Sequence, residues 1–142
     1  MHFNINGLKN KTQLLESEIC DMKNLNFLCI TEHQLTGGDF NDINISNYKI
    51  ASIFSRNDAK CGGSLIMTNV DFIENVIIKN MSRERHFECS AIDTDIGNLK
   101  CTIVCIYRPP TGNLELFFKL FEKIKIFVTR KNRVPIYYFV ET

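Results

Sequence analysis

The sequence predicts a single domain of the α/β class, and three observations support this prediction. Its 142 residues fall within the roughly 100–200 residues of one ordinary domain. With 44% apolar and 23% charged residues, the composition is that of a globular chain. Short apolar runs alternate with two helical patterns in the order strand, helix, several strands, helix, strand, without repeats or low-complexity segments.

Eight short runs of apolar and β-branched residues are predicted as strands. The run "CTIVCIY" is apolar throughout, as expected of a strand that is buried on both faces. The predicted strands are His2–Asn6, Phe27–Thr31, Tyr48–Phe54, Ser64–Thr68, Phe72–Ile78, Phe87–Ile92, Leu99–Tyr107 and Ile136–Val140.

The first helix is predicted from about Lys11 to Lys23, with Asn10 or Thr12 available as N-cap. Its apolar residues are spaced four and three apart, as on one face of a helix, and are Leu15, Ile19 and Met22.

The second helix is predicted to open on Asn113 as N-cap, just after the helix-excluding pair Pro109-Pro110. One stripe of this helix collects its apolar residues, which are Leu114, Phe117, Phe118, Phe121, Ile124 and Val128.

Charge and cysteine content narrow the possible roles of the chain. Seventeen Lys and Arg against sixteen Asp and Glu give a net charge of +1, so any nucleic-acid binding must come from a local site. The six cysteines show neither CxxC pairs nor zinc spacing, and we expect them to be reduced and buried. Without a signal peptide or an apolar run that could cross a bilayer, we expect an intracellular protein with no membrane partner.

Four motifs occur in order along the chain: "FNINGLKNK", "CITEHQL", "FSRNDAKCGGSLIM", and "ECSAIDT" followed by "CIYRPPTGN". Together they resemble the endonuclease/exonuclease/phosphatase superfamily, and within it the endonuclease domains of non-LTR (LINE-type) retrotransposons, which are associated with a reverse transcriptase. The resemblance implies a four-layer αββα sandwich and Mg²⁺-assisted hydrolysis of a phosphodiester in DNA, in the nucleus.

The resemblance also implies roles for individual residues. Glu32, at the end of the second predicted strand, matches the metal-binding glutamate, and a carboxylate oxygen suits Mg²⁺. Asn4 and Asn6 match positions that orient the metal site and the phosphate. Tyr107 matches a tyrosine that approaches the scissile phosphate, and Arg108 beside it is a candidate phosphate contact.

Each of these residues also has a purely structural explanation. The glutamate is then a surface residue at a strand end, the asparagines form a turn before a glycine, the tyrosine caps the core and the arginine is solvated. His33 and His86 have no His or Cys companions at ligand spacing and are predicted to be structural. Gly62-Gly63 is predicted as a turn or bulge.

The letters GDFN, which carry a catalytic aspartate in the family, occur here at Gly38–Asn41. They follow "LTG" in a segment rich in Gly, Asn and Asp, the composition of a solvated loop. We therefore interpret Asp39 as a loop residue whose match to the motif is coincidental.

Where the family motif belongs, the chain reads "VPIYYFVET". We therefore expect residues 1–142 to be a partial domain, truncated before that motif and holding the first half of the sandwich. Such a fragment lacks the groups that activate water and is expected to be inactive alone, to bind Mg²⁺ weakly and to self-associate through an uncovered sheet. Two alternatives remain: a non-catalytic module that binds protein or nucleic acid, and a superfamily member acting on another phosphoester.

Overall fold

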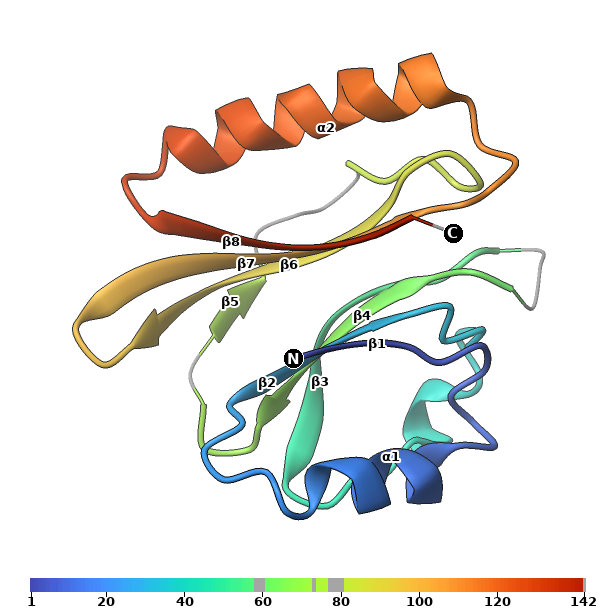
Figure 1. The fold of residues 1–142 in the computed structure, drawn as a ribbon, viewed down its shortest axis with the longest axis vertical. Coiled ribbons are helices and arrows are strands. Elements are labelled where there is room, and N and C mark those ends of the chain that lie inside the picture. Colours follow the sequence, from blue (N-terminus) through green and yellow to red (C-terminus); the bar gives the residue numbers. More distant parts are fainter. Residues whose placement is uncertain (58–60, 73, 77–80, 142) are drawn as a thin grey trace.

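The structure is a computed structural model that describes residues 1–57, 61–72, 74–76 and 81–141. Four layers follow one another, from a helix through two sheets to a second helix (Figure 1). Helix α1, Thr12–Ile19, covers the outer face of sheet A, and helix α2, Leu114–Thr129, covers the outer face of sheet B. The predicted αββα sandwich is therefore confirmed.

Sheet A contains four strands in the spatial order β1-β2-β4-β3. Strands β1 and β2 are parallel, whereas β2 pairs with β4 and β4 with β3 in antiparallel fashion. The strands are β1 His2–Asn4, β2 Phe27–Thr31, β3 Tyr48–Phe54 and β4 Ser64–Asn69.

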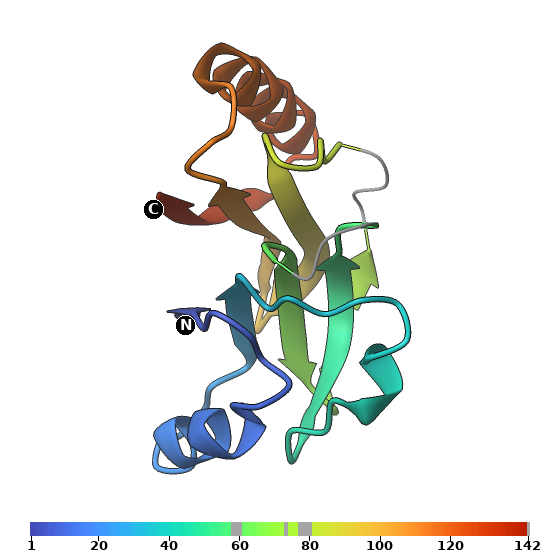
Figure 2. The same ribbon diagram turned by 90° about the vertical axis from the view of Figure 1, so that its right-hand side faces the viewer.

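Sheet B has the order β5-β6-β7-β8, with β5, β6 and β7 antiparallel and β8 parallel to β7. The strands are β5 Glu74–Val76, β6 Glu88–Ile96, β7 Leu99–Arg108 and β8 Val134–Glu141. Residues 73, 77 and 78 of the predicted strand Phe72–Ile78 lie outside the described residues. Strands β1 and β8 are edge strands on the same side of the sandwich, the side on which both termini lie (Figure 2).

Helix α2 begins as predicted, because the Asn113 side chain accepts a hydrogen bond from Leu116 N at 2.8 Å. Its stripe is only partly buried: Phe117 packs on sheet B, whereas Leu114 and Phe118 are half-exposed.

Helix α1 is shorter than predicted and ends at Ile19. Neither Asn10 nor Thr12 is its N-cap, since Lys11 occupies that position without a side-chain cap. Beyond the helix, Asn24 adopts a φ of +62° shortly before β2 begins.

The core between the sheets corrects the expectation of an uncovered sheet. Cys29 and Ile66 of sheet A belong to one buried cluster with Ile103 and Cys105 of sheet B. The chain therefore contributes strands to both sheets, whose inner faces cover each other, and β1 and β8 are each an edge strand of their sheet. The expectation was wrong because it assigned all the strands of the chain to one sheet.

The cysteines are free, but not all are buried as predicted. Cys29, Cys89, Cys101 and Cys105 are buried, whereas Cys20 and Cys61 are exposed. Within the described part of the chain, no helix is both long and apolar enough to cross a membrane.

Candidate metal and phosphate site

Two of the predicted site residues meet where β1 and β2 end. The strands are parallel, with Asn4 opposite Thr31, so their carboxyl ends lie at the same edge of sheet A. The Asn4 side chain donates a hydrogen bond from Nδ2 to Glu32 Oε1 at 3.2 Å. Glu32 is half-buried and Asn4 is exposed, so both side chains are accessible from solvent.

The segment that carries Glu32 has an unusual backbone. Glu32 has a φ of +55° and Gln34 a φ of +58°, in the left-handed region that most residues avoid. Asn6 on the facing segment has a φ of +46°, and its Oδ1 accepts a hydrogen bond from Gln34 Nε2 at 2.6 Å. Gly7 N also donates to Glu32 O at 2.8 Å. Asn6 is thus a turn former that also holds the segment of Glu32, and two predicted site residues are tied together through Gln34.

His33 lies between these two strained residues and is 1% exposed. Its Nε2 donates to the Phe54 carbonyl at 2.8 Å, and its Nδ1 accepts a hydrogen bond from Leu35 N at 2.9 Å. One nitrogen donates and the other accepts, so the imidazole is neutral. Burial lowers the pKa of His33 to about 4. His33 therefore has the structural role predicted for it, because both of its nitrogens are used within the fold.

A glycine pair holds the Glu32 segment from the other side. Gly63 O accepts a hydrogen bond from Glu32 N and Gly62 O accepts one from Gln34 N, each at 3.0 Å. Gly63 has a φ of +95°, and a Cβ there would overlap the imidazole of His33. A side chain at this position is therefore excluded both by the backbone conformation and by lack of space.

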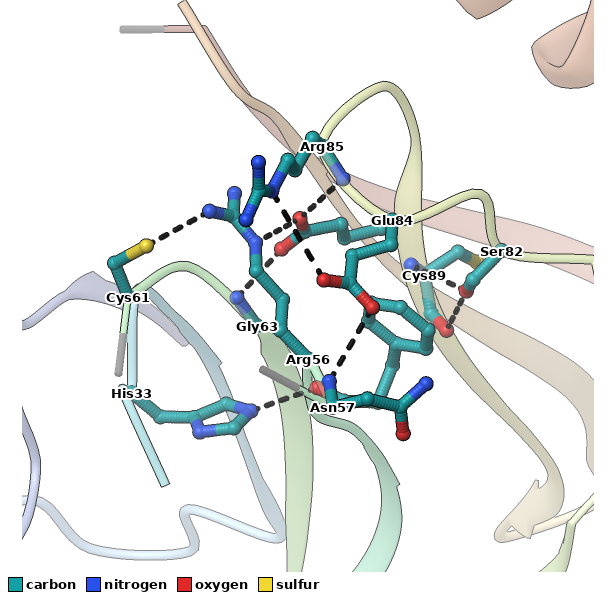
Figure 3. Close-up of polar contacts among 11 residues, drawn as sticks. His33, Arg56, Asn57, Cys61, Gly63, Ser82, Glu84, Arg85 and Cys89 are labelled. Carbon is teal, nitrogen blue, oxygen red and sulfur yellow. Dashed lines mark hydrogen bonds and ion pairs between the residues drawn. The ribbon is translucent and has the colours of Figure 1, made fainter. Parts of the chain in front are cut away.

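The glycine pair is in turn bound to Glu88, the first residue of β6. This carboxylate is fully buried and accepts hydrogen bonds from Gly63 N at 2.6 Å, Arg56 Nε at 2.6 Å and Arg85 N at 3.1 Å. In Figure 3 dashed lines join Arg56, Gly63 and Arg85 to one carboxylate, and a further line joins Arg56 to Cys61. The buried ion pair of Arg56 and Glu88 is thus linked to the backbone of Glu32, the candidate metal ligand, through Gly63.

Tyr107 and Arg108 end strand β7 in sheet B. Tyr107 is directly opposite Glu88 in the β6–β7 ladder and is 4% exposed. Arg108 follows it and is half-buried. The two residues therefore lie at the same end of the sandwich as Glu32, but a largely buried phenol is less accessible to a ligand than Glu32 or Asn4.

Asp39 of the GDFN letters has loop partners. Its carboxylate accepts hydrogen bonds from Thr36 N at 2.9 Å and Thr36 Oγ1 at 2.8 Å, and it pairs with Lys9 Nζ at 2.8 Å. The hydrogen bond from Lys9 and those from Thr36 hold the pKa of Asp39 well below its usual range. Asp39 is thus the predicted loop residue, engaged in holding the loop against the segment after β1.

The fit of a divalent ion depends on oxygen donors at the strand ends. Among the residues that the structure describes, no three His, Cys, Asp or Glu side chains come together as metal ligands. Glu32 supplies one accessible carboxylate, with the amide of Asn4 beside it. This pair suits Mg²⁺, which keeps several waters and takes one or two protein carboxylates.

Sequence reasoning missed Gln34, Arg56 and Glu88. Arg56 and Glu88 are 32 residues apart, and neither has a local pattern that marks a partner. The signal that existed was the acid in "FECSAI", because a charged residue at the head of an apolar strand requires a buried partner.

No protein-family model matches the sequence, and no curated protein sequence matches it significantly. Among solved structures, the chain is similar to the endonuclease domain of TRAS1, a telomere-specific non-LTR retrotransposon, with a TM-score of 0.66 and 12% identity over 97% of this chain and 56% of that one. It is similar to TDP2 from C. elegans, with a TM-score of 0.65 and 17% identity over 97% and 45% of the two chains.

A third similar structure is an AP endonuclease from Archaeoglobus fulgidus, with a TM-score of 0.62 and 14% identity over 97% of this chain and 55% of that one. The chain thus spans about half the length of the structures it matches. Two of these neighbours are endonucleases, and the arrangement of layers is shared along nearly the whole chain. The chain therefore has the fold of the endonuclease/exonuclease/phosphatase superfamily.

Proposed function

We propose that the chain is part of a Mg²⁺-dependent endonuclease domain that hydrolyses phosphodiesters in DNA, of the type found in non-LTR retrotransposons. The observation that carries this proposal is the hydrogen bond between Asn4 and Glu32 at the ends of two adjacent strands. It joins a carboxylate and an amide in a fold whose solved neighbours include two endonucleases, one of them from a retrotransposon.

Each proposed residue has a separate task. Glu32 would hold the ion through its carboxylate, and Asn4 would orient that carboxylate through Nδ2. A bound Mg²⁺ supplies polarisation of a phosphoryl oxygen. Arg108 and Tyr107 are proposed as phosphate contacts, and Asn6 as the residue that shapes the turn beside them. With 4% of Tyr107 exposed, only its hydroxyl is a candidate for reaching the phosphate.

The described residues offer one carboxylate at this position, and no cluster of three potential metal ligands accompanies it. We therefore propose weak Mg²⁺ binding by residues 1–142 and no turnover unless the rest of such a domain is supplied. The substrate proposed is DNA, and the location proposed with it is the nucleus. A different phosphoester and a binding role without catalysis are the competing functions.

The test compares three forms of the chain: the wild type, Glu32→Gln and, as matched control, Glu18→Gln on the exposed face of α1. Supercoiled plasmid is incubated with Mg²⁺ or with EDTA, and conversion to open circle is measured. We expect no Mg²⁺-dependent nicking by residues 1–142 in any form, because removing even one stabilising group costs about a hundredfold in rate.

The same variants are then placed in an extended chain that supplies the remaining part of the fold. Mg²⁺-dependent nicking is expected for the wild type and for Glu18→Gln, and its loss for Glu32→Gln. If the extended chain nicks DNA equally well with Gln at position 32, Glu32 is not the metal ligand. Activity on a sugar phosphate or another small phosphoester, with none on DNA, would favour the competing substrate class.

A further inference from the structure

The buried carboxylate of Glu88 has a set of partners that points toward the candidate site. A buried carboxylate needs compensation by charge and hydrogen bonds. Arg56 supplies the opposite charge, with 8% of its side chain exposed. Backbone N–H groups of Gly63 and Arg85 also donate to this carboxylate. Glu88 therefore joins three separate segments of the chain at one point.

The hydrogen bond to Gly63 leads directly to Glu32. The peptide group between Gly62 and Gly63 donates its N–H to Glu88 and accepts from Gln34 N through its carbonyl. The next carbonyl, Gly63 O, accepts from Glu32 N. Two hydrogen bonds from one glycine pair thus hold the backbone of Glu32 and Gln34, and Glu88 holds the glycine pair.

The backbone conformation of Glu32 and Gln34 is energetically unfavourable on its own. Glu32 and Gln34 both have positive φ, a conformation that persists only where surrounding contacts determine it. Glu32 carries the carboxylate that meets Asn4. If the glycine pair shifts, both left-handed residues lose a backbone hydrogen bond and the carboxylate no longer points at Asn4.

We propose that Glu88 is a positioning residue, whose carboxylate fixes the Gly62–Gly63 peptide and through it aims the side chain of Glu32. This inference rests on the proposed function where it concerns the metal, because it gives Glu32 its importance. The conformational part is independent of any metal and can be tested separately.

The first measurement is amide hydrogen exchange by NMR on the 142-residue chain. In Glu88→Gln the side chain keeps one acceptor oxygen, which cannot accept from Gly63 N and from Arg56 and Arg85 at the same time, as the two carboxylate oxygens do. Exchange of the Glu32 and Gln34 amides, relative to the Ile103 amide in the core of sheet B, is expected to become about tenfold faster or more. The ratio to Ile103 removes the effect of global unfolding.

The matched control is Asp93→Asn, which removes the charge of another buried acid on the same strand. It is expected to leave the exchange ratio unchanged. If both variants change the ratio equally, or if neither does, Glu88 does not position the Glu32 segment. Should Glu88→Gln not fold, Glu88→Asp keeps the charge but withdraws it from Gly63, and the same criteria apply to it.

The second measurement uses Mn²⁺ as a paramagnetic probe and follows the broadening of the Asn4 and Glu32 resonances. Glu88→Gln is expected to require about tenfold more Mn²⁺ than the wild type, and Asp93→Asn the same amount as the wild type. Absence of broadening in the wild type, together with the expected exchange result, refutes Glu32 as a metal ligand and leaves the positioning role intact. Broadening in the wild type with an unchanged exchange ratio refutes the positioning role alone.

Discussion

Strand β6 carries two buried acids, Glu88 at its beginning and Asp93 further along, and their partners differ in kind. Asp93 accepts from the Thr102 hydroxyl at 2.7 Å and pairs with Lys131 at 2.6 Å and with Arg133 at 3.7 Å. These three are side chains of sheet B or of the turn before β8. Glu88 pairs with the Arg56 side chain and also accepts hydrogen bonds from the backbone N–H groups of Gly63, next to sheet A, and of Arg85.

This difference separates support of the fold from control of a site. Around Asp93 two cations share one acid, so either can be lost and the acid keeps a partner. Around Glu88 the guanidinium of Arg56 pairs with the carboxylate, and the backbone bonds transmit any displacement to Glu32. The same chemical group thus binds side chains of sheet B at one position and backbone next to the candidate site at the other.

The largest change in unfolding free energy is expected from removing Arg56, the cation that pairs with Glu88. Arg56→Met should cost about 3–5 kcal/mol of unfolding free energy, because it removes the cation that pairs with the fully buried Glu88 carboxylate at 2.6 Å. Lys131→Met should cost only about 1 kcal/mol, since Arg133 and Thr102 still partner Asp93 and Lys131 is 25% exposed. Urea denaturation of both variants measures the difference, and equal losses would remove the distinction between the two acids.

A change in unfolding free energy of nearly the same size is expected when the pH is lowered, because His33 is buried as a neutral imidazole. The folded chain keeps this imidazole neutral down to about pH 4, whereas the unfolded chain protonates it near pH 6.5. Stability therefore falls as the pH is lowered from about 6.5 to about 4, by roughly 3 kcal/mol from this residue, and its contribution is constant below that range.

The measurement is the unfolding free energy of the wild type and of His33→Gln between pH 4 and pH 7. The variant has no imidazole to protonate, so its stability should depend less on pH than that of the wild type. An identical pH dependence in both proteins would show that His33 is not the titrating group.

The smallest change in unfolding free energy is expected from an exposed ion pair on helix α2. Lys125 and Glu122 of α2 pair at 2.9 Å, but both side chains are about half-exposed. Glu122→Gln should change the unfolding free energy by less than about 0.5 kcal/mol, because solvent screens such pairs. A loss comparable to that of Arg56→Met would mean that charge pairs stabilise this fold irrespective of burial.

Local patterns predicted the parts of the fold that local physics determines. The cap at Asn113 and the strand "CTIVCIY" are set by nearby residues, and both are present in the structure. The assignment of strands to sheets was not accessible in this way. The partition of the strands between two sheets depends on contacts such as that of Cys29 with Cys105, which are distant in sequence.

The candidate site shows the same division. Asn4 and Glu32 were found from motifs at strand ends, and the parallel pairing of their strands brings them together. Gln34 and Glu88 act through backbone groups of a glycine pair, and backbone hydrogen bonds leave little trace in residue types. The glycines themselves were visible, but the imidazole and guanidinium that lie against them were not.

The close packing at this glycine pair also limits how the sequence can drift. A side chain at Gly63 would overlap His33, and one at Gly62 would overlap the guanidinium of Arg56. Single substitutions at either glycine are therefore harmful, unless the facing residue first becomes smaller. Both glycines also have positive φ, which adds a second barrier to replacement. In related chains these four positions are expected to change as coordinated pairs, each glycine with the residue that packs on it.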